Sequence, residues 1–148
     1  MRTVLSQWGD TLDADLRACR RADHVVLAAP GTPQTRHIVD AAALAHARPG
    51  LHLVNVARGS LVDQDALLAA LDAGRIDSAS LDVTEPEPLP AGHPFYTHPR
   101  VRLSPHTSAI SPAQQTALVD KFVRNLARFD AGERLEDLLD AQRRARGY

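Results

Sequence analysis

The chain has 148 residues, of which 44% are hydrophobic and 24% are charged, with a formal net charge of -1 at pH 7. A chain of this length can bury a hydrophobic core without disulfides or a structural metal. The single cysteine, Cys19, excludes an internal disulfide scaffold. The near-neutral charge argues against nucleic-acid partners, and the absence of a long apolar run or export signal argues against a membrane partner, so we expect a cytoplasmic protein.

Short apolar segments alternate along the chain with segments of helical periodicity. The apolar segments are largely β-branched and are bounded by proline, glycine or charged residues, as is typical of strands. In chain order, strands are predicted at residues 25–29, 51–56, 78–83 and 101–103. Helices are predicted at residues 11–21, 40–46, 63–74 and 111–132.

End signals support two of these helices. Asp63 is a suitable N-cap for the third helix, and Gly74 can close it. Ser111, which a proline follows, opens the last helix, and Gly132 closes it. The last helix also carries an apolar stripe at helical spacing, which we expect to lie in a core. The stripe consists of Leu118, Phe122, Leu126 and Phe129.

Strands and helices in alternation predict an α/β fold, with a partial doubly wound parallel sheet and right-handed crossovers. The first two strands are nearly continuous in apolar character, which fits a parallel sheet covered on both faces. After Gly132 the chain becomes charged and has few apolar residues. We therefore divide it into residues 1–132, with one strand for each apolar segment and flanking helices, and residues 133–148, a helical tail.

Polar residues follow three of the predicted strands. Arg58 comes after the second strand, Glu85 and Glu87 after the third, and His106 after the fourth. In open α/β sheets, ligands bind at the carboxyl ends of the strands, where these side chains would converge. A guanidinium can hold a carboxylate through two bonds, a histidine can exchange a proton with a hydroxyl, and a carboxylate can orient that histidine. Together they indicate oxidation of a 2-hydroxy acid with hydride transfer to a nicotinamide.

Several sequence blocks in a fixed order resemble those of the D-isomer-specific 2-hydroxyacid dehydrogenases. The main blocks are NVARGSLVD at 55–63, LDV at 81–83, EPEPLP at 85–90, HPFY at 93–96 and SPH at 104–106. Upstream blocks are ADHVVLAAP at 22–30 and TPQTRHIV at 32–39. The resemblance runs from about residue 12 to the end of the chain. It implies the C-terminal half of a Rossmann-like, dinucleotide-binding domain.

The resemblance also implies roles for individual residues. Arg58 would hold the substrate carboxylate, His106 would be the acid/base, and Glu87 would be its carboxylate partner, with Glu85 as the alternative. Asp82 would lie by the nicotinamide carboxamide. The implied cofactor-binding set is Ala29, Pro30, Val56, Ala57, Arg58, Asp82, His106, Thr107 and Ser108. The substrate would be a small 2-hydroxy or 2-oxo acid, and the cofactor NAD or NADP. The other histidines are scattered, so we expect no metal site.

The sequence departs from the family pattern in its glycines. This family binds the dinucleotide phosphates with a Gly-x-Gly-x-x-Gly turn, and none of the eight glycines here forms a Gly-x-Gly pair. The resemblance therefore implies a truncated member that binds NAD or NADP weakly, or only with a partner that supplies the phosphate-binding loop.

A half-sheet of this kind would leave one strand unprotected. With the family's first three strands missing, residues 25–29 would be an open apolar edge, so we expect a homo-oligomer or a complementing chain. The alternative to a dehydrogenase is a non-catalytic interaction or regulatory module, or the half of a split enzyme, that associates through this edge.

Overall fold

The structure is a computed structural model that describes residues 3–6 and 20–138. The chain divides into two compact units, Met1–His106 and Thr107–Tyr148. The boundary lies ahead of the last helix, whereas sequence analysis placed a boundary after residue 132. The first unit contains β1 (Thr3–Ser6), β2 (His24–Leu27), α2 (Ala41–Ala45), β3 (His52–Asn55), η1 (Gly59–Leu61), α3 (Gln64–Asp72), β4 (Ser78–Leu81), η2 (Pro94–Tyr96) and β5 (Val101–Leu103). The second contains α4 (Pro112–Asp130).

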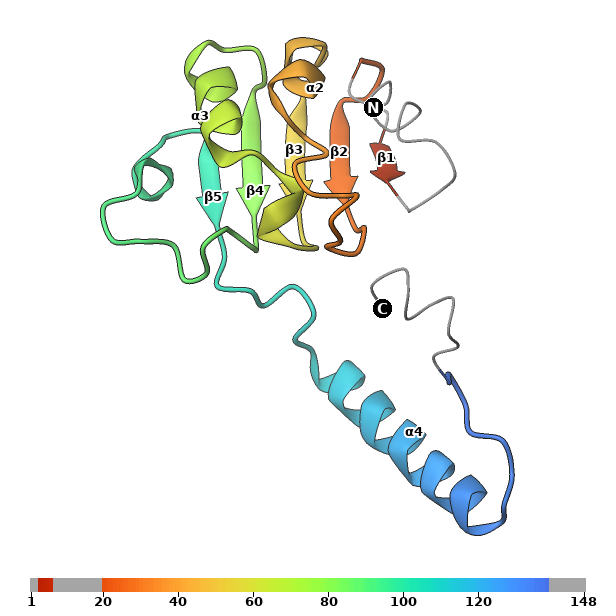
Figure 1. The fold of residues 1–148 in the computed structure, drawn as a ribbon. Helices are drawn as coiled ribbons and strands as arrows, with labels where there is room; N and C mark the ends of the chain where they lie inside the picture. The colour runs from red at the N-terminus through yellow and green to blue at the C-terminus, as the bar shows by residue number, and fades with distance from the viewer. Residues whose placement is uncertain (1–2, 7–19, 139–148) are drawn as a thin grey trace. The chain divides into compact units, whose positions relative to one another are not determined.

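The five strands form one parallel sheet in the order β1-β2-β3-β4-β5 (Figure 1). The predicted α/β fold and its four predicted strands are confirmed, whereas β1 was not predicted. Its pairing also corrects the expectation of an open edge at residues 25–29, because Val4 lies opposite Val25 and Leu5 opposite Val26. Among the described residues, β1 is the outer strand on that side. The helix predicted at residues 11–21 lies mostly outside the described residues.

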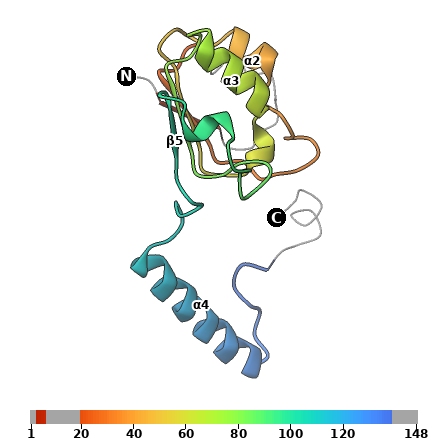
Figure 2. The same ribbon diagram turned by 90° about the vertical axis from the view of Figure 1, so that its left-hand side faces the viewer.

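Helices α2 and α3 lie side by side on one face of the sheet (Figures 1 and 2). Every second residue of β2, β3 and β4 is buried beneath them, because successive side chains of a strand point to opposite faces. The largest fully buried side chains include Leu53 of β3, Leu67 and Leu71 of α3, and Phe95 of η2. This core fixes the strand ends from which the polar loops leave.

The predicted caps are present and set the starts of the helices. The side chain of Asp63 accepts a hydrogen bond from the N–H of Ala66, at 3.0 Å. Ser111 accepts in the same way from the N–H of Gln114, at 3.1 Å. Gly74 follows α3 with a φ of +66°, a conformation that costs glycine little.

The opposite face of the sheet carries a row of polar side chains. His24 Nδ1 lies 3.3 Å from His52 Nδ1, and His52 Nε2 lies 2.9 Å from Ser80 Oγ. Partial burial, followed by the nearby His24, lowers the pKa of His52 below its ordinary value. The charge of Asp77 raises the pKa of His52 and the charge of Arg102 lowers it, both more weakly.

This shift predicts a pH-dependent stability. Because the pKa of His52 is lower in the folded chain, the unfolded chain binds the proton more readily below pH 6.5. We expect the free energy of unfolding to fall as the pH drops through 6.5, and His52→Gln to reduce this fall. Urea unfolding above and below this pH measures it, with His46→Gln as the control because His46 is exposed. An undiminished pH dependence in His52→Gln would contradict the assignment.

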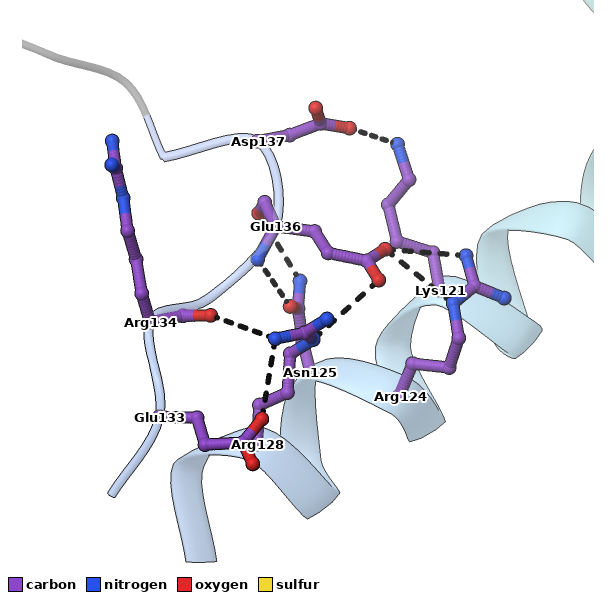
Figure 3. A network of polar contacts seen from close by, with 8 residues as sticks. All are labelled: Lys121, Arg124, Asn125, Arg128, Glu133, Arg134, Glu136 and Asp137. Carbon is purple, nitrogen blue, oxygen red and sulfur yellow. Dashed lines mark hydrogen bonds and ion pairs between the residues drawn. The ribbon is translucent and has the colours of Figure 1, made fainter. Parts of the chain in front are cut away.

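The second unit consists of α4 and the segment that returns along it (Figure 3). The N–H of Glu136 donates to Asn125 Oδ1 at 2.8 Å, and its carboxylate lies 3.3 Å from Arg124 Nη2. Lys121 pairs with Asp137 in the same network. Residues 133–138 form this network without helical structure, which corrects the prediction of a helical tail for that part. Residues 139–148 lie outside the described residues.

The apolar stripe of α4 is not part of a core in this structure. The stripe lies on a different side of α4 from the polar residues that contact residues 133–138. Its four predicted members are exposed by 50 to 70%. The predicted helix is thus confirmed, whereas the prediction that its apolar stripe is buried in a core is wrong for the described residues.

Candidate active site

The predicted site residues leave the sheet along one edge. Arg58 follows β3, Asp82 and Glu87 follow β4, and His106 follows β5. Because all the strands are parallel, these carboxyl ends point the same way (Figure 1).

His106 and Glu87 form a direct pair. His106 Nδ1 lies 2.6 Å from Glu87 Oε1, and both side chains are nearly half exposed. An ionised carboxylate only accepts hydrogen bonds, so Nδ1 carries the proton and donates it. This orientation leaves Nε2 of the imidazole for a second partner. The predicted pair of Glu87 and His106 is thus brought together.

The backbone of His106 lies in the left-handed region, with a φ of +54°. This conformation is sterically strained for a residue with a side chain, and residues in it concentrate at functional sites. The strain therefore supports a functional role for the position.

A cavity of about 360 Å³ opens beside this pair. Its volume suits a small ligand. Asp82 lies in its wall, is almost fully buried, and accepts a hydrogen bond from the hydroxyl of Ser104. The lining residues are Asp82, Thr84, Glu87, Pro88, Leu89, Tyr96, Leu103, Ser104, Pro105 and His106. Three predicted site residues, Asp82, Glu87 and His106, therefore share one cavity.

Arg58 belongs to a neighbouring loop and does not line that cavity. Its Nη1 donates to the carbonyl of Ala57 at 2.6 Å. The next residue, Gly59, packs so closely that a Cβ there would lie 2.1 Å from the carbonyl carbon and oxygen of Thr84. Since Thr84 lines the cavity, the arginine loop lies directly against the cavity wall.

Asn55 holds the arginine loop and was missed by sequence analysis. Its Nδ2 donates to the carbonyl of Arg58 at 2.8 Å, and its Oδ1 accepts from the N–H of Ala57 at 3.1 Å. The side chain is 1% exposed. The available signal was an amide at a buried position of a strand that also carries Leu53 and Val54, where an unpaired polar group is costly.

Glu85, the alternative partner of His106, has another partner. Its Oε1 lies 2.8 Å from Arg36 Nη1. This hydrogen bond lowers the pKa of the Glu85 carboxyl and raises the pKa of the Arg36 guanidinium. The arrangement leaves Glu87 as the carboxylate beside His106.

The remaining predicted cofactor residues fall into two groups. Ala29 and Pro30 follow β2, and Val56 and Ala57 follow the adjacent β3, so these four lie at neighbouring strand ends. Thr107 and Ser108 open the second unit and are described within that unit alone.

A family model described as D-isomer specific 2-hydroxyacid dehydrogenase, NAD binding domain, matches residues 9–108. The chain belongs to this family. Among curated relatives, glyoxylate/hydroxypyruvate reductase A of Serratia proteamaculans is 41% identical over 111 residues, which cover 75% of this chain and 35% of the relative.

Solved structures of the 2-hydroxyacid dehydrogenase family share the fold. A D-isomer specific 2-hydroxyacid dehydrogenase from Xanthobacter autotrophicus Py2, in complex with NADPH and MES, is 39% identical with a TM-score of 0.80, covering 93% of this chain and 43% of that one. NADPH-dependent glyoxylate/hydroxypyruvate reductase from Sinorhizobium meliloti, in complex with NADP and sulfate, is 30% identical with a TM-score of 0.82. That match covers 99% of this chain and 49% of the other. This chain thus spans less than half the length of each of these dehydrogenases.

Two further observations concern metals and membranes. Within the described part of this dehydrogenase-family chain, no group of three or more His, Cys, Asp or Glu side chains could hold a metal ion. No helix in the same residues is long and apolar enough to cross a bilayer.

Proposed function

We propose that this chain supplies the proton-transfer and substrate-carboxylate side of an NAD(P)-dependent 2-hydroxyacid dehydrogenase. The hydrogen bond between His106 Nδ1 and Glu87 Oε1, at the wall of the cavity, carries the proposal. The proposal agrees with the family to which the chain belongs.

The pair can move one proton in either direction. A nicotinamide bound there would supply the hydride acceptor for C2 of a 2-hydroxy acid, or the hydride donor for C2 of a 2-oxo acid. Nε2 of His106 takes the hydroxyl proton as the C2–O bond becomes a carbonyl, and it returns the proton in the reverse direction. Glu87 stabilises the imidazolium and keeps Nδ1 as a donor.

Arg58 is proposed to bind the substrate carboxylate. Its guanidinium offers parallel donors that match a carboxylate. The packing of Gly59 against Thr84 keeps its loop at the cavity wall. A substrate carboxylate would replace the carbonyl of Ala57 as the partner of Nη1.

The residues present fit the nicotinamide end of the cofactor. Asp82 presents a carboxylate in the cavity wall that can accept from a carboxamide, and Val56 is an apolar side chain that is 38% exposed at a strand end. We propose that Ala29, Pro30, Ala57, Thr107 and Ser108 complete the cofactor side. NAD and NADP both remain candidates, and NADPH is the first to assay because two related structures contain NADPH or NADP.

The phosphate-binding loop is proposed to come from outside these 148 residues. None of the eight glycines forms a Gly-x-Gly pair, and backbone N–H groups of such a turn normally bind the pyrophosphate. A complementing chain that carries such a turn would supply it, because a second copy of these residues lacks the same glycines. The alternative function, an interaction module joined through residues 25–29, loses its open edge because β1 pairs with β2.

A hybrid enzyme tests the proposal. The part of the Serratia reductase that precedes its matched segment is joined to this chain, and loss of NADPH absorbance is followed with glyoxylate or hydroxypyruvate. We expect turnover by the hybrid and weak NADPH binding by the 148-residue chain alone. Arg58→Ala should lower kcat/KM about 10- to 100-fold, mainly through KM, because it removes hydrogen bonds to a charged partner.

Arg58→Lys serves as the matched control in the hybrid, since it keeps the charge and loses the paired donors. We expect it to lie between the original and Arg58→Ala. A folded hybrid that binds NADPH but reduces no 2-oxo acid would overturn the proposed function.

A further inference from the structure

Gln64, the first residue of α3, forms two hydrogen bonds to the backbone of Glu85. Its Nε2 donates to the carbonyl of Glu85 at 2.6 Å, and its Oε1 accepts from the N–H of the same residue at 2.9 Å. The cap of α3 is made by Asp63 and not by Gln64. The amide thus matches both polar groups of one residue that lies 21 positions away.

Glu85 lies in the middle of a loop whose side chains are not buried in the core. From Thr84 to Pro88 no residue is buried, whereas Val83 before this segment and Leu89 after it are buried. The loop borders the active-site cavity through Thr84, Glu87 and Pro88. It also borders a second cavity, of about 530 Å³, through Glu85 and Pro86. Polar contacts, and not apolar packing, therefore determine where the middle of this loop lies.

Few free torsions separate Glu85 from Glu87. Pro86 lies between them and its ring fixes φ, and Pro88 restricts the backbone of Glu87. The hydroxyl of Thr84 donates to the carbonyl of Pro86 at 3.1 Å, and the Arg36 pair holds the side chain of Glu85. An anchor at Glu85 therefore also limits where the carboxylate of Glu87 can lie.

We propose that Gln64 is a positioning residue that holds the Glu85 backbone so that Glu87 stays hydrogen-bonded to His106. This inference rests on the proposed function, because only that function makes the pair of Glu87 and His106 catalytic. Gln64 itself lines the second cavity and not the active-site cavity, so it acts through the loop.

The tautomer of His106 provides the test, and it needs neither cofactor nor substrate. In the 148-residue chain, nitrogen NMR of the neutral imidazole distinguishes the Nδ1–H form from the Nε2–H form. Glu87 favours the Nδ1–H form by accepting its hydrogen bond. We expect Gln64→Ala to lower the ratio of Nδ1–H to Nε2–H about tenfold, as for loss of one hydrogen bond to a charged partner.

Three variants make the result specific. Glu87→Ala removes the acceptor and sets the scale of a lost pair, and Gln115→Ala in α4 is the matched control, expected to leave the ratio unchanged. Gln64→Glu keeps the size of the side chain and the acceptor for the Glu85 N–H, but it places an oxygen against the Glu85 carbonyl. It should therefore lower the ratio even if Gln64→Ala proves too unstable to study.

The outcomes separate this inference from the proposed function. If Glu87→Ala lowers the ratio and both Gln64 variants leave it unchanged, Gln64 is not a positioning residue and the pair still stands. If Glu87→Ala also has no effect, the pair itself is absent in solution, and both the inference and the observation that carries the proposed function are overturned.

Discussion

Replacing His106 with asparagine in the hybrid enzyme should lower kcat by about 10²- to 10⁴-fold, the range typical for loss of a general acid/base. Asparagine can still donate a hydrogen bond to Glu87, but it cannot take or return a proton at neutral pH. It also tolerates the left-handed backbone, at a φ of +54°, better than histidine does. Steady-state kinetics and thermal unfolding of the same preparation measure the two effects.

The expected combination is a nearly inactive variant that unfolds at the same temperature or a higher one. His46→Asn is the matched control, because His46 follows α2 and does not line the active-site cavity. A decrease in kcat of less than about tenfold would remove His106 from the proton transfer.

Replacing Gly59 with alanine should destabilise the chain by about 1–3 kcal/mol, the usual cost of overpacking a tight contact. The new Cβ would lie 2.1 Å from the carbonyl carbon and oxygen of Thr84 and 2.7 Å from the N of Glu85. These are backbone atoms, so the two loops must separate. Urea unfolding measures the loss, and in the hybrid the KM for the 2-oxo acid should rise because Arg58 moves with its loop.

Gly31→Ala is the matched control for this effect. Its Cβ would meet the Cγ of Arg58 at 2.9 Å, which is part of a flexible side chain that can move. We expect a smaller loss of stability than for Gly59→Ala. Equal losses in the two variants would show that the contact of Gly59 with Thr84 is not the critical one.

The elements that could be predicted from the sequence depend on local signals. The caps at Asp63 and Ser111 join groups three residues apart, so their residue types suffice to place the helix starts. Strand order predicted only that a carboxylate and His106 lie at one edge, since β4 and β5 are adjacent and parallel, and the resemblance to the family singled out Glu87.

The parts that could not be predicted depend on contacts between distant residues. Strand β1 becomes a strand only through its pairing with β2, about 20 residues later. Gln64 and Arg36 reach Glu85 from 21 and 49 positions away. Nothing in the local sequence of either residue indicates such a partner, and the resemblance to the family assigned neither a role.

The turn beside Asn55 restricts which side chains fit at position 55. The turn that carries Arg58 needs one donor and one acceptor on a short side chain with almost no exposure. Aspartate has the length but lacks the donor, glutamine has both groups but an extra methylene, and serine is too short to reach both sites. We therefore expect any substitution of Asn55 to disturb the turn that carries Arg58, even though Asn55 does not line the cavity.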